Sequence, residues 1–444
     1  MTTMIPRRAP ELLLRPIDEE HAYAVNCAVP GSFRILNKVQ YEILNAVNGR
    51  DPLAVLSMRT GVNTETLERF LIMLSRTEIV RFDDHFSVPQ KTLQPKSLNF
   101  WIHTTNACNL GCSYCYIATL NNGKGMSEHV RNQLLHKLEE TVRNRKIRHV
   151  KFRLAGGEPL SQFRAWQTFI PVARERLQQF GCVIDFSFLT NLTMLNEEMV
   201  EFSKQHNIGY GVSIDGVGDR HDATRKFRSG KGSFPVVDTN LRKLVLNGIS
   251  VSVTTVISNQ NLTALPELTR YLIALDVPFR YSIVKGETID AVSLEAYLSA
   301  SYGIMGEAID IGWQFSRRHQ FCDLKPNELG FQTCASGFSG GAIDVDGSLK
   351  YCHVHFGDES ERSHSIFDPS LDLVDMIEQG SHYEDDRSGD CLKCRYRFVC
   401  TSGCPVYRVD QKDPQCSIYH KFIPKIYELQ ARERLNSLHK NENI

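Results

Sequence analysis

The sequence lacks both an excess of charge and any apolar run long enough to span a membrane. Its 444 residues contain 51 Lys and Arg against 51 Asp and Glu, which gives a formal net charge of zero. A balanced chain has no general attraction for nucleic acid or for an anionic membrane. The first twenty residues hold only a short Leu triplet before acidic residues resume, which excludes a signal peptide or a membrane span there. We therefore expect a cytoplasmic protein with no nucleic-acid partner and no membrane partner.

Disulfide bonds are also not expected, because the cytoplasm keeps thiols reduced. The chain nevertheless has thirteen cysteines, which predicts metal ligands or buried thiols. Most of them fall in a triplet near residue 110 and in a longer series between residues 322 and 416. Cys27 and Cys182 stand apart in strand-like apolar segments, and we expect them to be core residues.

The chain is longer than one typical domain, and its pattern changes along its length. Residues 1–90 show short alternating strands, then helical periodicity, then a short strand, which is a winged-helix-like order. The segment LNKVQYEILNAVNG predicts a helix with Asn37 as its cap and Gly49 as its stop. Its expected apolar face consists of Val39, Ile43, Leu44 and Val47.

A second helix is predicted over NTETLERFLIMLSR in the same region. Asn63 is its expected cap, and Glu65 lies four residues before Arg69, a spacing that favours an ion pair. Residues 87–97 are polar and contain two prolines, so we expect a linker there.

Between residues 98 and 310 short apolar strands alternate with helix-length segments. The expected strands are LNFWIHTT, VKFRLAGG, IDFSFLTN, IGYGVSID, VSVTTVIS and FRYSIVKG. The expected helices cover residues 127–145, 161–179, 196–206, 234–247 and 263–275. Six such units, with strands apolar on both faces, favour an α/β fold with a parallel sheet, most simply a partial (β/α)6 barrel of the TIM type.

Polar motifs follow the predicted strands, and in such barrels the chemistry collects at the carboxyl ends of the strands. The cysteine triplet follows the first strand. The other positions are Gly156, Gly157 and Glu158 after the second strand, Asn191 after the third, and Ser213 and Asp215 after the fourth. We expect these motifs to meet at one rim. Asn191, Ser213 and Asp215 could instead cap helices.

Residues 311–420 are rich in loops and cysteines, which predicts a separate module organised by metal. Within it, GAIDVDGSLKYCHVHF predicts a hairpin around Asp346 and Gly347, with Cys352 on its second strand. Residues 421–444 complete the chain: residues 421–437 predict an amphipathic helix, and we expect the polar end HKNENI to fray.

The triplet consists of Cys108, Cys112 and Cys115, one ligand short of a structural metal site. A 4Fe-4S cluster has four irons, each of which takes one ligand beyond its sulfides. Three thiolates leave one iron open, and an open iron can chelate a substrate or cofactor through an amine and a carboxylate. The alternatives are buried thiols, or a zinc site that a distant ligand completes.

The C-x3-C-x2-C spacing, with the aromatic Tyr114 before the third cysteine, resembles the signature of the radical SAM superfamily. The resemblance extends over residues 98–310. It implies a 4Fe-4S cluster on the triplet and S-adenosyl-L-methionine (SAM) at the open iron. Reductive cleavage of SAM leaves a 5′-deoxyadenosyl radical, which can take hydrogen from an unactivated carbon. A barrel that excludes water and holds the target carbon close would suit this chemistry.

The same resemblance implies which residues contact SAM. The GGEP of residues 156–159 is similar to the family motif that contacts the SAM amino group. Asn191 and Ser213 occupy places where relatives touch the nucleoside or the methionyl part. Arg225, in HDATR, also follows the family pattern. The pattern assigns no further catalytic residue.

The C-terminal series resembles the SPASM module of peptide-modifying radical SAM enzymes, on the spacing Cys391-x2-Cys394-x5-Cys400-x3-Cys404 with a Gly347-x4-Cys352 pair upstream. The resemblance implies two auxiliary 4Fe-4S clusters, three clusters in all. One would be held by Cys391, Cys394, Cys400 and Cys416, and the other by Cys334, Cys352 and Cys404. We expect Cys322 as the eighth ligand, the alternative being an open iron that binds a substrate group. Zinc is the alternative metal, because Cys-x2-Cys pairs also bind zinc.

The first ninety residues resemble the RiPP recognition element, a winged-helix module related to the pyrroloquinoline-quinone peptide chaperone. Such modules bind the leader of a precursor peptide as an added strand. The alternative is a DNA-binding winged helix. Residues 1–95 contain 11 Lys or Arg and 11 Asp or Glu, so they lack the basic surface that DNA favours.

Together the three regions predict a maturase that acts on a ribosomally made precursor peptide with a leader. Its electrons would come from a reductase or from a flavodoxin or ferredoxin. The product would be a thioether, a C–C or C–O crosslink, or another oxidised residue, and auxiliary clusters would suit removal of the second electron. The sequence does not choose among these products or name the peptide.

Two other functions compete with this prediction. Anaerobic sulfatase maturases, which make formylglycine, carry an Asp directly after the Gly-x4-Cys cysteine and lack the leader-binding module. Here that position is His353, which could be a base near the substrate or simply a partly exposed hairpin residue. The second competitor is an iron-sulfur redox sensor that binds DNA, and it would not cleave SAM.

Overall fold

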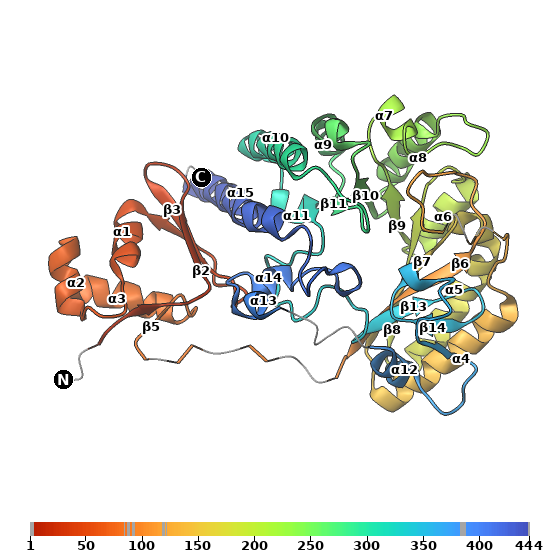
Figure 1. Cartoon of the computed structure of the whole chain (residues 1–444), viewed down its shortest axis with the longest axis horizontal. Helices are drawn as coiled ribbons and strands as arrows, with labels where there is room; N and C mark the ends of the chain where they lie inside the picture. The colour runs from red at the N-terminus through yellow and green to blue at the C-terminus, as the bar shows by residue number, and fades with distance from the viewer. Residues whose placement is uncertain are drawn as a thin grey trace.

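The N-terminal region folds around a three-stranded antiparallel sheet in the computed structural model (Figure 1). The structure describes residues 4–83, 85–86, 89–90, 94–117, 120, 122–381 and 388–442. Five residues of the predicted linker at residues 87–97, and the end of the predicted frayed tail, lie outside the described residues. The N-terminal elements are β1 (Arg7–Arg8), β2 (Leu12–Pro16), β3 (His21–Asn26), β4 (Arg34–Asn37), α1 (Lys38–Ala46), α2 (Leu53–Thr60), α3 (Thr64–Ser75) and β5 (Val80–Arg81).

Both predicted helix caps of this region are confirmed. Asn37 accepts a hydrogen bond from the Gln40 backbone, and the Gln40 side chain bonds back to the Asn37 N–H. Asn63 accepts from the backbone N–H of Glu65, whose side chain pairs with Arg69 at 2.5 Å. The elements β1, β2 and α2 were not predicted, because a strand of two residues and a short unpatterned helix carry little periodicity.

One prediction for α1 is wrong. Ile43, Leu44 and Val47 are buried, but Val39 is 52% exposed. Val39 lies in the first turn of the helix, where no described element covers its side chain, so helical spacing alone did not determine its burial. The two isolated cysteines, Cys27 and Cys182, are buried, as predicted.

The central sheet confirms the alternation of strands and helices. Its parallel strands follow one another in chain order: β6 (Ser97–Thr105), β7 (His149–Gly156), β8 (Val183–Thr190), β9 (Gly209–Ser213), β10 (Val251–Ile257), β11 (Phe279–Ile283) and β12 (His319–Phe321). The intervening helices are α4 (Glu128–Arg145), α5 (Phe163–Gln178), α6 (Glu197–Gln205), α7 (Asp219–Asp222), α8 (Phe234–Leu246), α9 (Leu265–Ala274), α10 (Ala291–Asp310) and α11 (Phe315–Arg318). The first six strands and five of the helices are those predicted.

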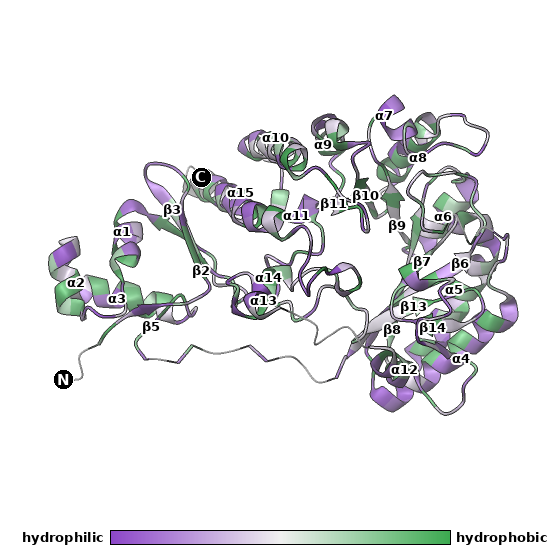
Figure 2. Cartoon of the chain, viewed as in Figure 1, coloured by the Kyte–Doolittle hydropathy of each residue, from purple (hydrophilic) through white to green (hydrophobic). Residues whose placement is uncertain are grey.

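The strands are not apolar on both faces, which corrects one expectation. In β7, Val150, Phe152 and Leu154 are buried, whereas the alternate residues Lys151 and Arg153 are only half-buried. The helices cover the first face, and their amphipathic colouring is visible in Figure 2. The second face is polar because it lines a cavity.

The cysteine-rich segment was expected to form a separate module, but its strands join the central sheet. Strands β13 (Gly340–Ile343), β14 (Ser348–Lys350) and β15 (Ser363–Ser365) extend the central sheet to ten strands, because β13 pairs in parallel with β6. The predicted hairpin exists, and β13 pairs with β14 in antiparallel register. Cys352 lies two residues beyond β14 and not on it, because β14 ends where the chain turns into a short 3-10 helix at His353–His355.

The C-terminal helix joins the two ends of the molecule. The remaining helices are α12 (Leu373–Gly380), α13 (Gly389–Lys393), α14 (Arg397–Cys400) and α15 (Cys416–Glu442). The last of these begins five residues before the prediction. It lies between the N-terminal sheet and α10 (Figure 1), and the Tyr23 hydroxyl donates to the Pro424 carbonyl at 3.1 Å. The residues Leu13, Tyr23, Val25 and Phe33 accordingly belong to the core of the central sheet.

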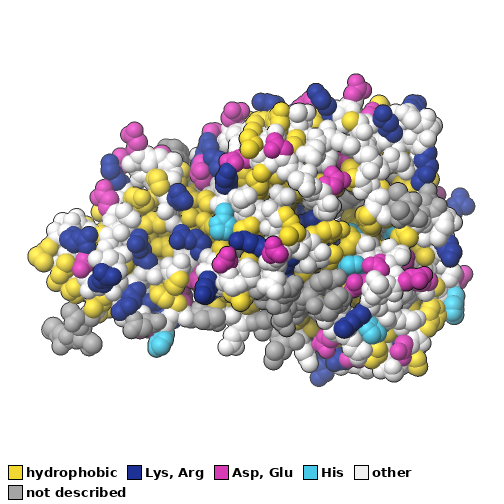
Figure 3. All heavy atoms as spheres, in the orientation of Figure 1, with side chains coloured by type: hydrophobic (Ala, Val, Ile, Leu, Met, Phe, Trp, Pro, Cys, Tyr) yellow, Lys and Arg dark blue, Asp and Glu magenta, His cyan; other side chains and the backbone are white. Residues whose placement is uncertain are grey.

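The surface agrees with the balanced charge of the sequence. Figure 3 shows basic and acidic side chains interspersed over one face. Among the described residues, no helix combines the length and the apolar character that a membrane span requires.

Candidate functional site

The cysteine triplet lies in the loop after β6, and a second segment of the chain fixes that loop. The Gly111 N–H donates to the Lys226 carbonyl at 2.8 Å, and the Ser113 N–H to the Thr224 carbonyl at 3.1 Å. The Arg228 side chain donates to the Cys108 carbonyl at 2.9 Å. The three thiols are partly buried. The loop is therefore held by residues 224–228, which sequence reasoning did not connect with it, apart from Arg225.

Two glycines at the end of β7 let this strand contact the base of the loop. The Gly157 N–H donates to the Thr105 carbonyl at 2.7 Å, and the Glu158 N–H to the Ala107 carbonyl at 2.8 Å. A Cβ at Gly157 would lie 2.1 Å from the Ala107 oxygen, and Gly156 has a φ of 130°. Only glycine fits both positions.

The Glu158 side chain is fully buried and points toward β8. Its carboxylate accepts from the Thr190 hydroxyl at 2.6 Å, from the Asn191 N–H at 2.8 Å and from the Leu160 N–H at 3.0 Å. Burial raises the pKa of Glu158 to about 7, against the effect of these hydrogen bonds. The side chain thus connects β7 to β8, and the structure shows it bonded within the protein.

Asn191 connects the end of β8 to the cysteine loop. Its amide donates to the Asn109 side chain at 2.9 Å and lies 3.7 Å from the Cys108 sulfur. Its carbonyl oxygen accepts from Thr193. The N-terminal cap of α6 is Asn196, so the helix-cap interpretation of Asn191 is wrong.

Arg225, Asp215 and Tyr114 form a buried cluster beside the second cysteine. The Arg225 guanidinium donates to Asp215 at 2.7 Å and to the Tyr114 hydroxyl, and lies 3.7 Å from the Cys112 sulfur. Tyr114 donates to the same Asp215 oxygen, as does Thr224. Asp215 caps no helix, and its charge raises the pKa of the Arg225 side chain despite burial. Burial raises the pKa of the Cys112 thiol, and the charge of Arg225 opposes that rise.

Ser213 ends β9 in register with Thr254 of β10, and it caps no helix. It lies on the sheet face that lines a cavity of about 690 Å³. Leu189, Gly211 and Thr254 line this cavity. The structure therefore brings the triplet, residues 156–158, Asn191, Ser213 and Arg225 to one rim above the cavity.

The eight C-terminal cysteines separate into neighbouring sets. Burial, with a smaller contribution from the charges of Cys334 and Cys404, raises the pKa of Cys352 to about 12. Burial likewise raises the pKa of Cys400 to about 12, with Cys416 and Cys394 among its neighbours. The charges of Cys391 and Cys394 in turn raise the pKa of Cys416, so these thiols are also neighbours.

Cys322 is buried, and it shares neighbours with the first set. The charges of Cys322 and Cys404 both raise the pKa of Lys285. The charges of Cys322 and Cys334 likewise raise the pKa of Arg280. A histidine that sequence reasoning missed lies at the second set: His420 Nε2 is 3.5 Å from the Cys394 sulfur. The sequence feature that could have indicated His420 is its position four residues after Cys416 on α15, which places both side chains on one face of the helix.

The spacing of the thiols fits clusters better than single ions. Among the described residues, no three cysteine sulfurs all lie within 4.8 Å of one another. Three thiolates on one zinc ion would be closer than that, because Zn–S bonds are about 2.3 Å long. Ligands of separate irons in a cubane are spread more widely.

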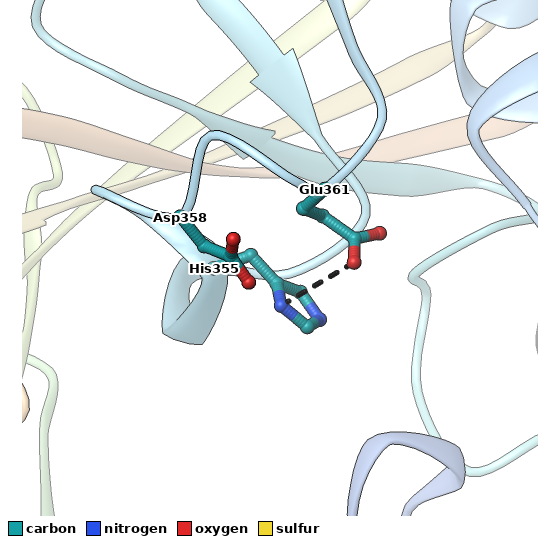
Figure 4. A group of neighbouring side chains, drawn as sticks. All are labelled: His355, Asp358 and Glu361. Carbon is teal, nitrogen blue, oxygen red and sulfur yellow. Dashed lines mark ion pairs between the residues drawn. The ribbon is translucent and has the colours of Figure 1, made fainter.

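A different group of side chains does lie close enough for one ion. His355, Asp358 and Glu361, in the loop between β14 and β15, have ligand atoms within 4.8 Å of one another (Figure 4). The Lys350 ammonium donates to the His355 carbonyl at 3.0 Å and to the Asp358 carbonyl, so a positive charge already lies beside this loop. Sequence reasoning missed this group, whose signal is the H-x2-D-x2-E spacing.

Sequence comparison agrees with the geometry of the rim. Residues 102–272 match the Radical SAM superfamily. An uncharacterised protein of Methanocaldococcus jannaschii is 32% identical over 40% of this chain, and the match spans only 58% of that protein. A cysteine-type anaerobic sulfatase-maturating enzyme of Clostridium novyi is 24% identical over 70% of this chain and 88% of its own length.

Two solved structures share the fold. The structure of anSMEcpe with bound AdoMet and the Kp18Cys peptide covers 78% of this chain and 99% of its own, with a TM-score of 0.61 and 18% identity. Streptococcus suis SuiB bound to the precursor peptide SuiA covers 92% and 98%, with a TM-score of 0.53 and 13% identity. The chain therefore carries a radical SAM domain over residues 102–272, which marks it as an enzyme, and its parallel-sheet core is like those of anSMEcpe and SuiB.

Proposed function

We propose that the chain is a maturase that modifies a ribosomally made precursor peptide by radical chemistry. The observation that carries the proposal is the rim, where an incomplete set of three thiols is joined by hydrogen bonds to Asn191 and Arg225. SAM bound at the cluster would supply a 5′-deoxyadenosyl radical that abstracts hydrogen from the peptide.

The residues of the rim would hold the cluster and SAM in the following way. Cys108, Cys112 and Cys115 would ligate three irons, and Arg225 would stabilise the thiolate of Cys112. The loop at Gly156 and Gly157 would present its backbone to SAM, while the buried Glu158 side chain would fix the loop against β8. Ser213 and Asn191 would contact SAM from β9 and β8.

We further propose that the C-terminal cysteines hold two auxiliary 4Fe-4S clusters in a SPASM module. One cluster would be held by Cys391, Cys394, Cys400 and Cys416, and the other by Cys334, Cys352, Cys404 and Cys322. The two sets of neighbouring thiols and the shared neighbours of Cys322 support this division.

The N-terminal region would bind the leader of the precursor. Its three-stranded sheet and three helices are the elements of a RiPP recognition element, and a sheet with free edges can accept a peptide as an added strand. Support also comes from SuiB, whose structure holds a precursor peptide and covers 92% of this chain. The electron donor would be a reductase, a flavodoxin or a ferredoxin of the cytoplasm.

Formylglycine formation is the second candidate, because the C. novyi relative is a sulfatase-maturating enzyme. The residue after Cys352 is His353, whose ring stacks on Trp101 with centroids 4.0 Å apart. Its second neighbour is Tyr116, at 5.0 Å. A histidine that packs against two aromatic rings is placed differently from an exposed base, and this favours the peptide-crosslinking function.

The test is a turnover assay with SAM under anaerobic conditions. The purified chain is reconstituted with iron and sulfide, reduced with dithionite and incubated with SAM, and 5′-deoxyadenosine is measured by chromatography. Cys112→Ala should abolish the product, and Cys182→Ala, a buried cysteine away from the rim, should not. Absence of 5′-deoxyadenosine with the wild type would reject the proposal in favour of a redox sensor.

Mass spectrometry then distinguishes the two enzymatic functions. Short peptides encoded beside this gene are co-expressed with it, and a loss of two hydrogens indicates one crosslink. A sulfatase-derived peptide that is converted to formylglycine, while no such precursor is modified, would instead establish the second candidate.

A further inference from the structure

The cavity beneath the rim is lined by positively charged side chains from the strands. Lys151 and Arg153 lie at alternate positions of β7, and Arg280 lies on β11 across the cavity. In the register of the sheet Lys151 pairs with Asp185 and Arg153 with Ser187, while Arg280 pairs with Thr254. All of these residues line the same cavity of about 690 Å³.

Two of these cations have no counter-charge in contact with them. Asp185 pairs with His149 at 2.8 Å, and Asp323 with Arg280 at 2.7 Å. Within the part of the chain that the structure describes, neither Lys151 nor Arg153 has an ion pair or side-chain hydrogen bond. The Nε atom of Arg280 is also buried without a hydrogen-bond partner among the described residues.

The three cations repel one another, and among the described residues only Arg280 has an ion-pair partner. Burial and the charge of Arg153 lower the pKa of Lys151, and the charge of Asp185 acts in the opposite direction. Burial and the charge of Arg280 lower the pKa of Arg153, with Asp323 and Cys334 acting in the opposite direction. A partly buried cation without a partner is unfavourable, and an anion that enters the cavity would relieve this cost.

Two residues of the cavity wall are neighbours of rim residues along the sheet. Leu189 precedes Thr190 and Asn191, and Thr254 is the register partner of Ser213. Gly211 leaves room for the Leu189 side chain in this part of the wall, because a Cβ at Gly211 would lie 2.5 Å from that side chain. An anion held between Arg153 and Arg280 would thus lie within the cavity, below the rim.

Resting on the proposed function, we propose that this cavity binds a carboxylate side chain, Asp or Glu, of the peptide segment that the enzyme modifies. A peptide has no other common anionic side chain. Arginine presents its donors as a planar fork that matches a carboxylate, and Lys151 adds a third cation. The carboxylate would hold the neighbouring residue of the peptide toward the rim.

The experiment uses the reconstituted full-length enzyme with SAM and a library of nonapeptides with amidated C-termini and three randomised central positions. Bound peptides are separated by size and sequenced by mass spectrometry. We expect Asp and Glu to be enriched at least about fivefold over Asn and Gln, as a bidentate charged contact would give. A second library, with a free C-terminal carboxylate and no acidic residue, shows whether a terminal carboxylate is accepted as well.

The variants assign the selectivity to the cavity. The double variant Lys151→Met and Arg153→Met should lose the enrichment, whereas Arg143→Met on the outer helix α4, also an exchange of Arg for Met, should keep it. Arg153→Lys should recover part of it. Equal binding of acidic and amide residues by the wild type, or an enrichment that survives the double variant, would overturn the proposal.

The test of the carboxylate site can be distinguished from the test of the proposed function, because the two have different readouts. Formation of 5′-deoxyadenosine is measured on the same samples, and the double variant should retain it, because neither residue belongs to the rim. SAM cleavage without acidic selectivity would reject only the carboxylate site. Loss of SAM cleavage in the wild type would reject the proposed function itself.

Discussion

Gly157 shows how the absence of one side chain fixes the position of the loop that carries the cysteine triplet. No Cβ can be placed between β7 and the Ala107 carbonyl, so an alanine there must displace the loop that carries the triplet. Gly111, within that loop, has nothing within 4 Å of its Cβ position and an ordinary φ. A substitution of Gly111 is therefore the control for the same substitution of Gly157.

The first prediction uses this pair. Gly157→Ala should lower the rate of 5′-deoxyadenosine formation at least about a hundredfold, since a small misplacement of reacting groups has that effect. Gly111→Ala should retain the rate within about twofold, because its Cβ meets no atom. The rates are measured by chromatography, and equal rates for the two variants would contradict the role of Gly157.

The second prediction concerns Arg225. Arg225→Met leaves the buried carboxylate of Asp215 without its cation, which should lower the free energy of unfolding by about 3 to 5 kcal/mol. The double variant Arg225→Met and Asp215→Asn should recover part of the loss. Denaturant unfolding of the four proteins in the cycle measures this, and strict additivity would show that the pair does not interact.

At the scale of an element, the short helix α7 holds Asp215 through a chain of hydrogen bonds. The Asp215 N–H donates to His221 Nδ1 at 3.4 Å, His221 Nε2 lies 3.0 Å from the Ser233 hydroxyl, and that hydroxyl donates to the Arg225 carbonyl at 2.7 Å. This arrangement requires the neutral imidazole, with its proton on Nε2. Burial, together with the charge of the nearby Arg225, lowers the pKa of His221 to about 4.

The third prediction follows from the sign of that shift. A histidine whose pKa is lower in the folded state contributes stability at neutral pH that is lost as the pH falls through about 6.5 toward 4, up to about 3 kcal/mol. Glu158, whose pKa is raised, acts in the opposite direction over a similar range. The effect is therefore measured as a difference: His221→Gln should be destabilised relative to wild type at pH 7 and less so at pH 4. A constant difference across this range would contradict it.

At the scale of the whole molecule, the C-terminal helix α15 packs against the N-terminal sheet and so joins the two ends of the chain. The faces of the N-terminal sheet differ: Ala22 and Ala24 of β3 belong to a core with α1 to α3, whereas Tyr23 and Val25 pack into the main core that includes α15. The N-terminal region is therefore bound to the catalytic part by apolar contact. An ordered connection of this kind would hold a leader at a fixed distance from the rim.

The fourth prediction tests this connection. Tyr23→Ala should lower the free energy of unfolding by about 3 to 5 kcal/mol, as a large buried aromatic residue does. Tyr41→Ala, on the partly buried side of α1, should cost less. Calorimetry measures both, and a single transition that shifts as a whole would show that the two cores unfold together.

The fifth prediction concerns the clusters. The reconstituted wild type should hold about twelve irons, as three cubanes require. Cys108→Ala and Cys391→Ala should each reduce the number toward about eight, because each removes a ligand of a different cluster. Cys322→Ala should change the electron paramagnetic resonance spectrum of one auxiliary cluster. Zinc in place of iron would contradict all three expectations.

The sequence by itself determined most of the local elements and the order of the central strands. Asn37 and Asn63 cap their helices as predicted, because a cap depends on residues within one turn. Burial of Val39 was not determined in this way, since it depends on which element covers the helix. The same holds for β13, whose pairing with β6 joins residues more than two hundred positions apart.

The tertiary structure alone decided which polar side chains meet. The sequence indicated the triplet and the glycines from their spacing, but it gave no sign that Asp215 would pair with Arg225 or that Glu158 would point toward β8. It also did not show that Lys151, Arg153 and Arg280 face one cavity. Alternation along a strand shows that two residues share a face, whereas the curvature and register of the sheet determine which residues face them across the cavity.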